Sequence, residues 1–319
     1  PEALMWVLRR IAVAFVLVLI VASIVFLAIR LVPGDPAELM LSQGGVSPDP
    51  ALVAELREQL GLDAPIWVQY WANLKALATG SLGVSLTDQA SVAQQVFARL
   101  PRTLELIAAA ALLSILLGIP LGLLAAVYRG SWLDRAVMAV SGLSLSIPVF
   151  VVGTLLVLVL AQWLSLLPAG GFTPLARDPG RHFTQLLMPA LTISSSLAPV
   201  LLGMTRAAVI DVVTRDHVRT ARAKGIAPRA VVLHHVLRNA LIPVVTVLAL
   251  HLGTLLGGTV LVEYVFNYPG LSGLLVDSVN ARDYPMVQGV VLVISVLFVA
   301  LNLLMDLVYG ALDPRVRHA

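Results

Sequence analysis

The residues of this chain best suited to a chemical role form a basic segment at positions 211–243, between two long apolar stretches. Asp211 and Arg215 stand four residues apart with the acid first, an order that stabilises a helix. Arg222 and Lys224 would then lie in the last turn of that helix, where positive charge complements the backbone dipole. The chemistry that such a segment offers is binding, because it presents positive charge on a stiff element.

Glycine and proline mark where this segment turns. Gly225 stands where a residue with left-handed backbone follows a helix, and Pro228 suits the first turn of the next helix. We therefore predict a helix, a sharp turn at 225–227, a second helix, and a return to the apolar part near Ala240–Pro243. A plain basic loop beside a membrane would carry similar charge. Such a loop does not need two capped helices, so the pattern favours a docking element.

The sequence lacks the motifs of common catalytic sites. Its two lysines, Lys75 and Lys224, both lie outside any Gly-x-x-x-x-Gly-Lys-Ser/Thr string, so any ATP must be hydrolysed on another chain. Neither His-Glu-x-x-His nor Gly-x-Ser-x-Gly occurs, and cysteine is absent. His234 and His235 are adjacent and would point to different helix faces. We therefore predict no catalytic residue and no metal site, and we do not expect an enzyme.

Composition places the chain in the membrane class. Of its 319 residues, 59% are hydrophobic and 12% charged, whereas ordinary soluble domains carry about 25% charged residues. The net charge is only +3. Lys and Arg are dispersed between apolar stretches rather than gathered on one face, so we do not expect a nucleic-acid partner.

Long apolar windows predict an all-α polytopic membrane protein. A helix needs about 20 apolar residues to cross the bilayer core. If both termini are cytoplasmic, the short loops on the cytoplasmic side hold more Lys and Arg than those on the other side. This bias favours cytoplasmic N- and C-termini. Six windows qualify as transmembrane helices: 11–30, 103–127, 136–162, 186–209, 241–262 and 287–310.

The segment between the first two predicted spans, roughly 31–102, is long enough to fold. Residues 49–60 have helical spacing of leucines, and Trp67, Tyr70 and Trp71 form an aromatic cluster typical of a membrane interface. We expect a small folded region outside the membrane. It either only packs on the helices or serves as a docking surface or vestibule wall.

At this point the chain resembles a known family. The basic segment, together with further strings, is similar to the dipeptide/oligopeptide branch of the inner-membrane permeases of type I ABC importers. The strings that carry the resemblance run through nearly the whole chain: Pro33-Gly-Asp-Pro36, Leu56-Arg-Glu-Gln-Leu-Gly-Leu-Asp63, Gly80-Ser-Leu-Gly83, Gly118-Ile-Pro-Leu-Gly122, Arg219-Thr-Ala-Arg-Ala-Lys-Gly225, His235-Val-Leu-Arg-Asn-Ala-Leu-Ile-Pro243, Glu263-Tyr-Val-Phe266, Tyr268-Pro-Gly270, Arg282-Asp-Tyr-Pro285 and Leu312-Asp-Pro-Arg315.

The basic segment departs in part from the pattern of the wider superfamily, which has Glu-Ala-Ala at its start and a glycine six residues after the Glu. Gly225 and Ala221 match that pattern, but Arg219 stands at the Glu position and Thr220 at the first Ala position. Of the element that follows, only Leu237 matches. A contact with the partner through the family's Glu is therefore not expected here.

The resemblance implies a type I ABC importer permease fold with six transmembrane helices. It also implies a coupling helix that fits a groove on a cytoplasmic ATPase subunit. The coupling residues carried over are Arg219, Thr220, Ala221, Arg222, Ala223, Lys224, Gly225, Ile226, Ala227 and Pro228. The implied organisation is a cytoplasmic N-terminus and first helix at 1–30, a folded extracytoplasmic loop at 31–102, a transmembrane core at 103–310 with the coupling loop at 210–240, and a cytoplasmic tail at 311–319.

The resemblance also implies the partners. The chain would be a permease of the bacterial inner membrane that forms half of a translocation path for peptides. A second homologous permease subunit, two ATP-binding subunits (a homodimer or a heterodimer) and an extracytoplasmic solute-binding protein would complete the importer. This chain would need no cofactor, since ATP and Mg would bind the ATPase subunits. Dipeptides, longer peptides and nickel chelates all remain open as cargo.

Polar residues within the predicted spans are candidates for the translocation path. Ser194, Ser195 and Ser196 lie in the fourth span, and His251 lies in the fifth, where an ionisable group is a functional candidate. His251 could instead hydrogen-bond a neighbouring helix. An ATP-independent secondary transporter or channel is the alternative function, and it would be expected to show intramembrane charge pairs or inverted repeats.

Glycines at helical spacing predict close helix contacts in two spans. Gly118 with Gly122, and Gly253 with Gly257, would each let a second helix approach. We expect packing within this chain, with contact to a second permease subunit as the alternative.

Overall fold

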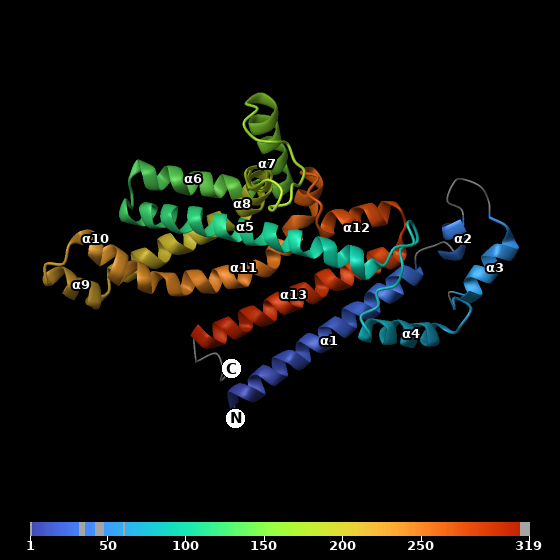
Figure 1. Ribbon diagram of the computed structural model, residues 1–319. Coiled ribbons are helices and arrows are strands. Elements are labelled where there is room, and N and C mark those ends of the chain that lie inside the picture. Colours follow the sequence, from blue (N-terminus) through green and yellow to red (C-terminus); the bar gives the residue numbers. More distant parts are fainter. Residues whose placement is uncertain (1, 32–35, 42–47, 60, 313–319) are drawn as a thin grey trace. The chain divides into compact units, whose positions relative to one another are not determined.

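The computed structural model describes residues 2–31, 36–41, 48–59 and 61–312, and these are helical almost throughout (Figure 1). The predicted tail from 313 onward, and the string at 33–35, lie outside the described residues. The helices are α1 (Glu2–Leu31), α2 (Pro36–Leu41), α3 (Pro50–Gln59), α4 (Ile66–Ala78), α5 (Val92–Val127), α6 (Trp132–Ser146), α7 (Val149–Leu156) with a π-helical continuation (Val157–Trp163), α8 (Pro179–Val213), α9 (Asp216–Ala223), α10 (Pro228–Ala230) with a π-helical continuation (Val231–Leu237), α11 (Arg238–Val265), α12 (Leu271–Asn280) and α13 (Tyr284–Leu312).

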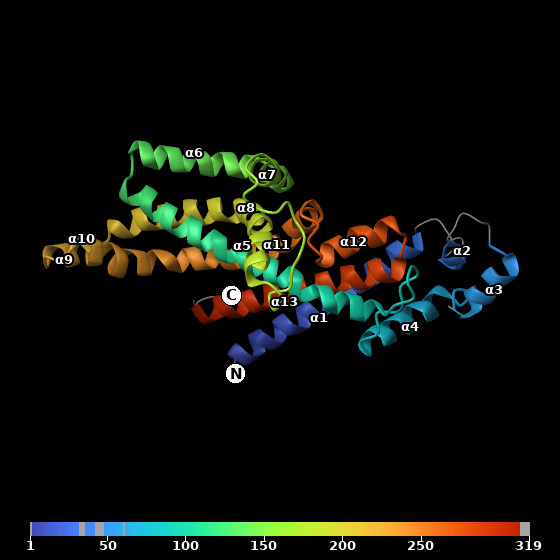
Figure 2. The same ribbon diagram turned by 45° about the horizontal axis from the view of Figure 1, so that its top comes forward.

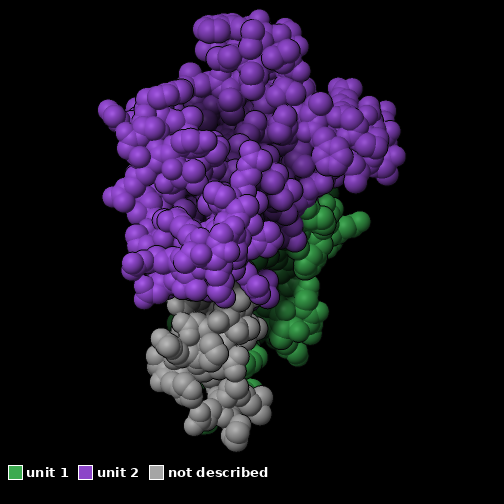
Figure 3. Space-filling model, turned by 90° about the vertical axis from the view of Figure 1, so that its left-hand side faces the viewer, with its two compact units in different colours: residues 1–101, 270–303 green, residues 102–269, 304–319 purple. Residues whose placement is uncertain are grey.

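The chain divides into two compact units, which Figure 3 colours separately. Unit 1 comprises residues 1–101 and 270–303, and unit 2 comprises residues 102–269 and 304–319.

Unit 1 contains the helices of the predicted folded segment. The helix expected at 49–60 is confirmed as α3, and the three predicted aromatic residues lie on α4. Trp67 and Trp71 are about two-thirds exposed, whereas the Tyr70 hydroxyl forms a 2.6 Å hydrogen bond with Ser23 Oγ of α1. A buried apolar cluster joins the start of α5 to α12 and α13 through Val92, Val96, Leu271, Leu274, Met286 and Val290.

At five of the six predicted positions, the structure has a long helix that is a candidate membrane span. In the described residues, five helices are long and apolar enough to cross a membrane, or up to six if a bent pair counts as one span. The spans run over Val7–Ala28, Val92–Val127, Pro179–Val213, Pro228–Gly253 and Tyr284–Leu304.

The third predicted span is the exception, because a continuous helix over 136–162 is wrong. α6 and α7 meet at 107°. The break lies at Ile147 and Pro148, where Ile147 has extended backbone with φ −94° and ψ 128°. A proline disfavours helical backbone in the residue before it and lacks the N–H that would continue the helix. The sequence therefore contained the signal for the break.

Unit 2 is built around α8, against which α6, α7 and α11 all pack. α5 also approaches α8 closely at its glycines. A Cβ placed on Gly118 would lie 2.8 Å from the carbonyl oxygen of Ala198, and one on Gly122 would lie 2.5 Å from that of Leu202. The predicted contact within this chain is confirmed for this pair. At Gly257, by contrast, no described atom lies within 4 Å of such a Cβ, so that glycine makes no close contact here.

Candidate functional site

The basic segment forms a short helix that is set apart from the long helix before it. α8 ends at Val213, Arg215 has extended backbone with φ −74° and ψ 151°, and α9 then begins at Asp216. The Arg215 guanidinium contacts Asp211 Oδ2 at 2.6 Å. This pair was predicted to stabilise the helix of the basic segment from within. It instead links the last turn of α8 to the junction with α9.

The predicted turn is confirmed at Gly225. Its backbone is left-handed, with φ +74°, and its N–H donates to the carbonyl oxygen of Arg222 at 3.0 Å. The N–H of Ile226 donates to the carbonyl oxygen of Ala221 at 3.4 Å. These two bonds occupy carbonyls at the end of α9, which have no partner within the helix.

The predicted second helix is confirmed to begin at Pro228, and it continues without a break into the apolar stretch. The chain is helical from Pro228 to Val265, through α10, the π-helical residues and α11. Pro228 begins this run, as the proline rule predicts. The proline at 243 lies inside α11 and does not end it. The turn therefore leads directly into a long helix, and a displacement of the turn can pass along that helix.

One face of α9 anchors it to the rest of unit 2. Val218 and Ala221 are buried in an apolar cluster with Val212 of α8 and with Val231 and Val236 that follow the turn. The other face is exposed and basic. Of the ten predicted coupling residues, Ala221 is buried and Ile226 is half-buried, while the exposed ones are Arg219, Thr220, Arg222, Ala223, Lys224, Gly225, Ala227 and Pro228. Figures 1 and 2 both show α9 projecting past the turn between α5 and α6.

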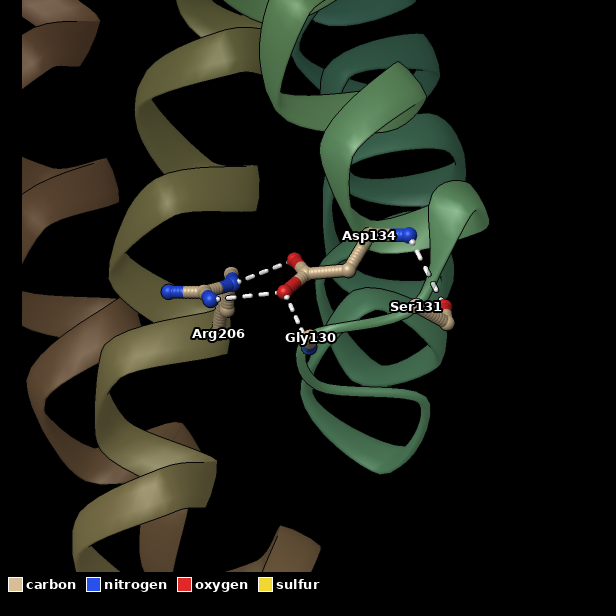
Figure 4. A network of polar contacts seen from close by, with 4 residues as sticks. All are labelled: Gly130, Ser131, Asp134 and Arg206. Atoms are coloured by element: carbon tan, nitrogen blue, oxygen red, sulfur yellow. Dashed lines mark hydrogen bonds and ion pairs between the residues drawn. The ribbon is translucent and has the colours of Figure 1, made fainter.

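An ion pair between a buried carboxylate and a half-buried guanidinium joins the α5–α6 turn to α8 close to this end of unit 2 (Figure 4). Arg206 contacts both carboxylate oxygens of Asp134, through Nε at 2.7 Å and Nη2 at 2.9 Å. The Gly130 N–H donates to the same carboxylate at 2.9 Å, and Ser131 Oγ caps α6 by accepting from the Asp134 N–H. The Asp134 side chain is only 6% exposed. Two charge-assisted bonds in parallel fix the position of the turn on α8.

Sequence reasoning missed this ion pair, although a signal for it was present. Arg206 lies inside the predicted span at 186–209, and a charged residue within a span normally needs a partner. Asp134 is an acid at the start of the preceding apolar helix, which makes it a candidate partner.

A second polar cluster lies at the other end of α8, and it was also missed. His182 places Nε2 2.8 Å from Glu105 Oε1 and Nδ1 2.8 Å from the carbonyl oxygen of Thr173. The Tyr268 hydroxyl donates to Glu105 Oε2 at 3.3 Å. Burial, together with the nearby Glu105 carboxylate, raises the pKa of Tyr268 above its ordinary value. The cluster ties the loop before α8 and the residues after α11 to α5.

The four candidate path residues do not come together at one place. Ser194 and Ser195 line a cavity between α5, α6 and α8, and the lining does not include Ser196 or His251. Each serine hydroxyl donates to the carbonyl oxygen three residues earlier in α8. His251 is half-buried on α11. Their role in a translocation path stays a prediction.

Comparison with known proteins then identifies the class. Residues 118–318 match the family described as binding-protein-dependent transport system inner membrane component, and residues 3–107 match its N-terminal membrane component family. The chain belongs to this family. It is accordingly a permease subunit of a binding-protein-dependent ABC importer, a multi-pass protein of the inner membrane that is not itself a catalyst. It functions as part of a transport system with an ATPase and a binding protein.

Several curated relatives match over almost the whole chain. The glutathione transport system permease protein GsiC of Salmonella choleraesuis (strain SC-B67) is 41% identical, over 98% of this chain and 99% of the relative. The protein of the same name from Escherichia coli (strain K12) is 39% identical, with the same coverage.

Solved structures agree on the fold. Two crystal forms of the inward-facing MetNI methionine ABC transporter, the CY5 SeMet soak and CY5 native forms, each match with a TM-score of 0.56. Each match covers 69% of this chain and 97% of the solved chain, at 19% and 20% sequence identity. The chain therefore has an all-helical, ABC-importer permease-like fold, and the family assignment does not support the alternative of an ATP-independent transporter.

Proposed function

We propose that this chain imports peptides. The resemblance to the dipeptide/oligopeptide branch supports this, as do relatives at about 40% identity that are named for transport of glutathione, itself a tripeptide. Short peptides of two to a few residues are the cargo class that both supports have in common. Within the same branch of permeases, the alternative cargo is a nickel chelate.

The exposed basic face of α9 is the proposed docking element for the ATPase. Its geometry suits this role, because Val218 and Ala221 anchor it to α8 and to the helix after the turn while Arg219, Arg222 and Lys224 stay exposed. Moving a two-state gate from about 1:99 to 99:1 takes about 5.5 kcal/mol of differential binding. A helix buried on one face can transmit such energy into α8 and α11, whereas a loose loop would absorb it.

The remaining arrangement is also proposed. Six crossings with α6 and α7 as the third, and both termini in the cytoplasm, give the charge distribution that membrane insertion favours. In this arrangement residues 1–30 hold the N-terminus and first crossing, 31–102 lie outside the membrane, 103–310 form the core with the coupling loop at 210–240, and 311–319 are cytoplasmic. A second homologous permease subunit and two ATP-binding subunits complete the complex, and Ser194, Ser195, Ser196 and His251 are the candidate path residues.

ATP-dependent uptake into vesicles tests this function. The permease would be reconstituted with its ATPase subunits and binding protein, and uptake of labelled glutathione and of a labelled dipeptide would be measured with and without ATP. We expect uptake only with ATP and binding protein, and competition by unlabelled short peptides. Uptake of a nickel chelate with which unlabelled peptides do not compete would refute a peptide cargo. Uptake without ATP would refute the importer mechanism.

A further inference from the structure

Helix α4 of unit 1 carries two exposed tryptophans. Trp67 is 65% exposed and Trp71 is 66% exposed. They stand four residues apart and so lie on one face of the helix, and Lys75 continues the same line one turn further on. Val68 and Ala72 beside them are exposed as well. The outward face of α4 is therefore aromatic and apolar, with one positive charge near its end.

The other face of α4 packs on two helices that are candidate membrane spans. The Tyr70 hydroxyl forms a 2.6 Å hydrogen bond with Ser23 Oγ of α1, and the Tyr70 ring meets the Phe26 ring edge-on, with centroids 5.5 Å apart. Gln288 Nε2 of α13 donates to Asn73 Oδ1 at 3.0 Å. Separate contacts thus hold α4 against α1 and against α13.

These contacts give the depth of α4 relative to the bilayer. Ser23 lies five residues before the end of the candidate span Val7–Ala28, and Gln288 lies four residues after the start of the candidate span Tyr284–Leu304. At 1.5 Å per residue, the two positions are about 7.5 Å and about 6 Å inside the ends of the spans. A helix that lies on a membrane sinks its apolar face about 5–10 Å into the boundary between headgroups and acyl chains. Both contacts therefore place α4 at that boundary.

The charge pattern distinguishes α4 from the neighbouring helix in the sequence, α3. No acidic residue occurs in α4. On α3, by contrast, the exposed Leu52 is followed at helical spacing by Glu55 and Glu58, which are also exposed. Tryptophan is enriched at the level of lipid headgroups, and a lysine there can extend its charge toward them. The exposed face of α3 therefore suits water, and the exposed face of α4 suits lipid.

We propose that the face of α4 with Trp67 and Trp71 lies against lipid, at the boundary between headgroups and acyl chains. In this position α4 holds the region between the first two spans on the membrane surface. Its depth is that of the lipid headgroups, whereas a solute-binding protein approaches from water. This inference does not depend on the cargo of the importer.

Fluorescence quenching in the assembled importer tests the proposal. The chain contains no cysteine, so Trp71→Cys and Leu52→Cys each supply one thiol for a fluorophore, with partner subunits that lack reactive cysteine. Both side chains are more than half exposed, so neither change removes a buried contact. The labelled importers are placed in phosphatidylcholine vesicles. Quenching by a phospholipid with a nitroxide on its acyl chain is then compared with quenching by iodide in the water.

We expect the nitroxide lipid to quench the fluorophore at position 71 severalfold more than the one at position 52. Iodide should show the reverse order, because an ion does not enter the apolar layer. Trp67→Cys should respond as Trp71→Cys does, since both tryptophans lie on the same face and are equally exposed. It supplies the measurement if the Trp71→Cys complex does not assemble.

Three results would overturn the proposal. Quenching at position 71 by iodide but not by the nitroxide lipid would place this face of α4 in water. Quenching by neither agent would show that the second permease subunit or another protein covers the face. Equal quenching at positions 71 and 52 by the nitroxide lipid would remove the distinction between α4 and α3 on which the proposal rests.

Discussion

Replacement of Gly225 by asparagine or by leucine separates two explanations of the coupling segment. These two side chains are similar in size and shape, but asparagine tolerates left-handed backbone far better than leucine does. Gly225 has φ +74°, and no described atom lies within 4 Å of a Cβ placed on it. A new side chain therefore meets open space in this chain, and its cost within the subunit arises from the backbone alone.

The magnitude follows from that backbone. A residue with a Cβ in left-handed conformation costs about 1–2 kcal/mol, and asparagine offsets part of this through local hydrogen bonds. Since 1.4 kcal/mol is about tenfold in an equilibrium constant, leucine should lower the ratio of correctly bent to other conformations of the segment roughly 5- to 30-fold. The cluster of Val218 and Ala221 holds α9 whichever side chain is present, so the protein should still insert and assemble.

The assay is cargo-stimulated ATP hydrolysis and uptake by the reconstituted importer, with the amount of assembled complex measured in parallel. We expect Gly225→Asn to retain most of the stimulation and Gly225→Leu to lose most of it at equal assembly. Normal stimulation in Gly225→Leu would refute the role of the bend. Equal impairment in both variants would show that the space in the partner's groove, rather than the backbone conformation, is what matters.

Two further predictions concern the stability of unit 2, each measured by thermal unfolding of the assembled complex. Asp134→Ala should lower the unfolding temperature, because it removes both charge-assisted bonds that Arg206 makes to the residue that positions the α5–α6 turn. The additional Arg206→Ala change should restore part of the loss, and strictly additive losses would show that the pair has no coupling. Gly122→Leu should cost about 1–3 kcal/mol by overpacking, since its Cβ would lie 2.5 Å from the Leu202 carbonyl oxygen. Gly142→Leu, which faces open space, is the control, and equal losses in both would contradict close packing of α5 on α8.

Much of the fold could be predicted from the sequence, because apolar length and turn residues act locally. The long apolar windows correspond to candidate spans, and Gly225 adopts the left-handed turn that its position indicates. The prediction of a continuous third span was wrong because it rested on apolar composition alone. It left out the restriction that Pro148 imposes on the backbone of Ile147.

The polar contacts of the site were harder to predict, because they join residues far apart in the sequence. Asp134 with Arg206, and Glu105 with His182, meet only when α5, α6 and α8 pack together. A charge within a span indicates that a partner exists, but it does not say which carboxylate supplies the partner. The junction at Arg215 was missed for a different reason, since the acid-first pair at 211 and 215 is compatible both with one continuous helix and with a bridge across a break.

Site-specific crosslinking tests the central claim, that the basic face of α9 docks on the ATPase. The chain contains no cysteine, so a single introduced thiol is its only one. Thr220→Cys places that thiol on the exposed face of α9, and Thr184→Cys places it at an exposed position in the opposite end of α8. In the assembled importer a short thiol–amine crosslinker should join Cys-substituted position 220 to the ATPase subunit in high yield, and position 184 should give no such product. Absence of the product from position 220, or equal yields from both positions, would contradict the account.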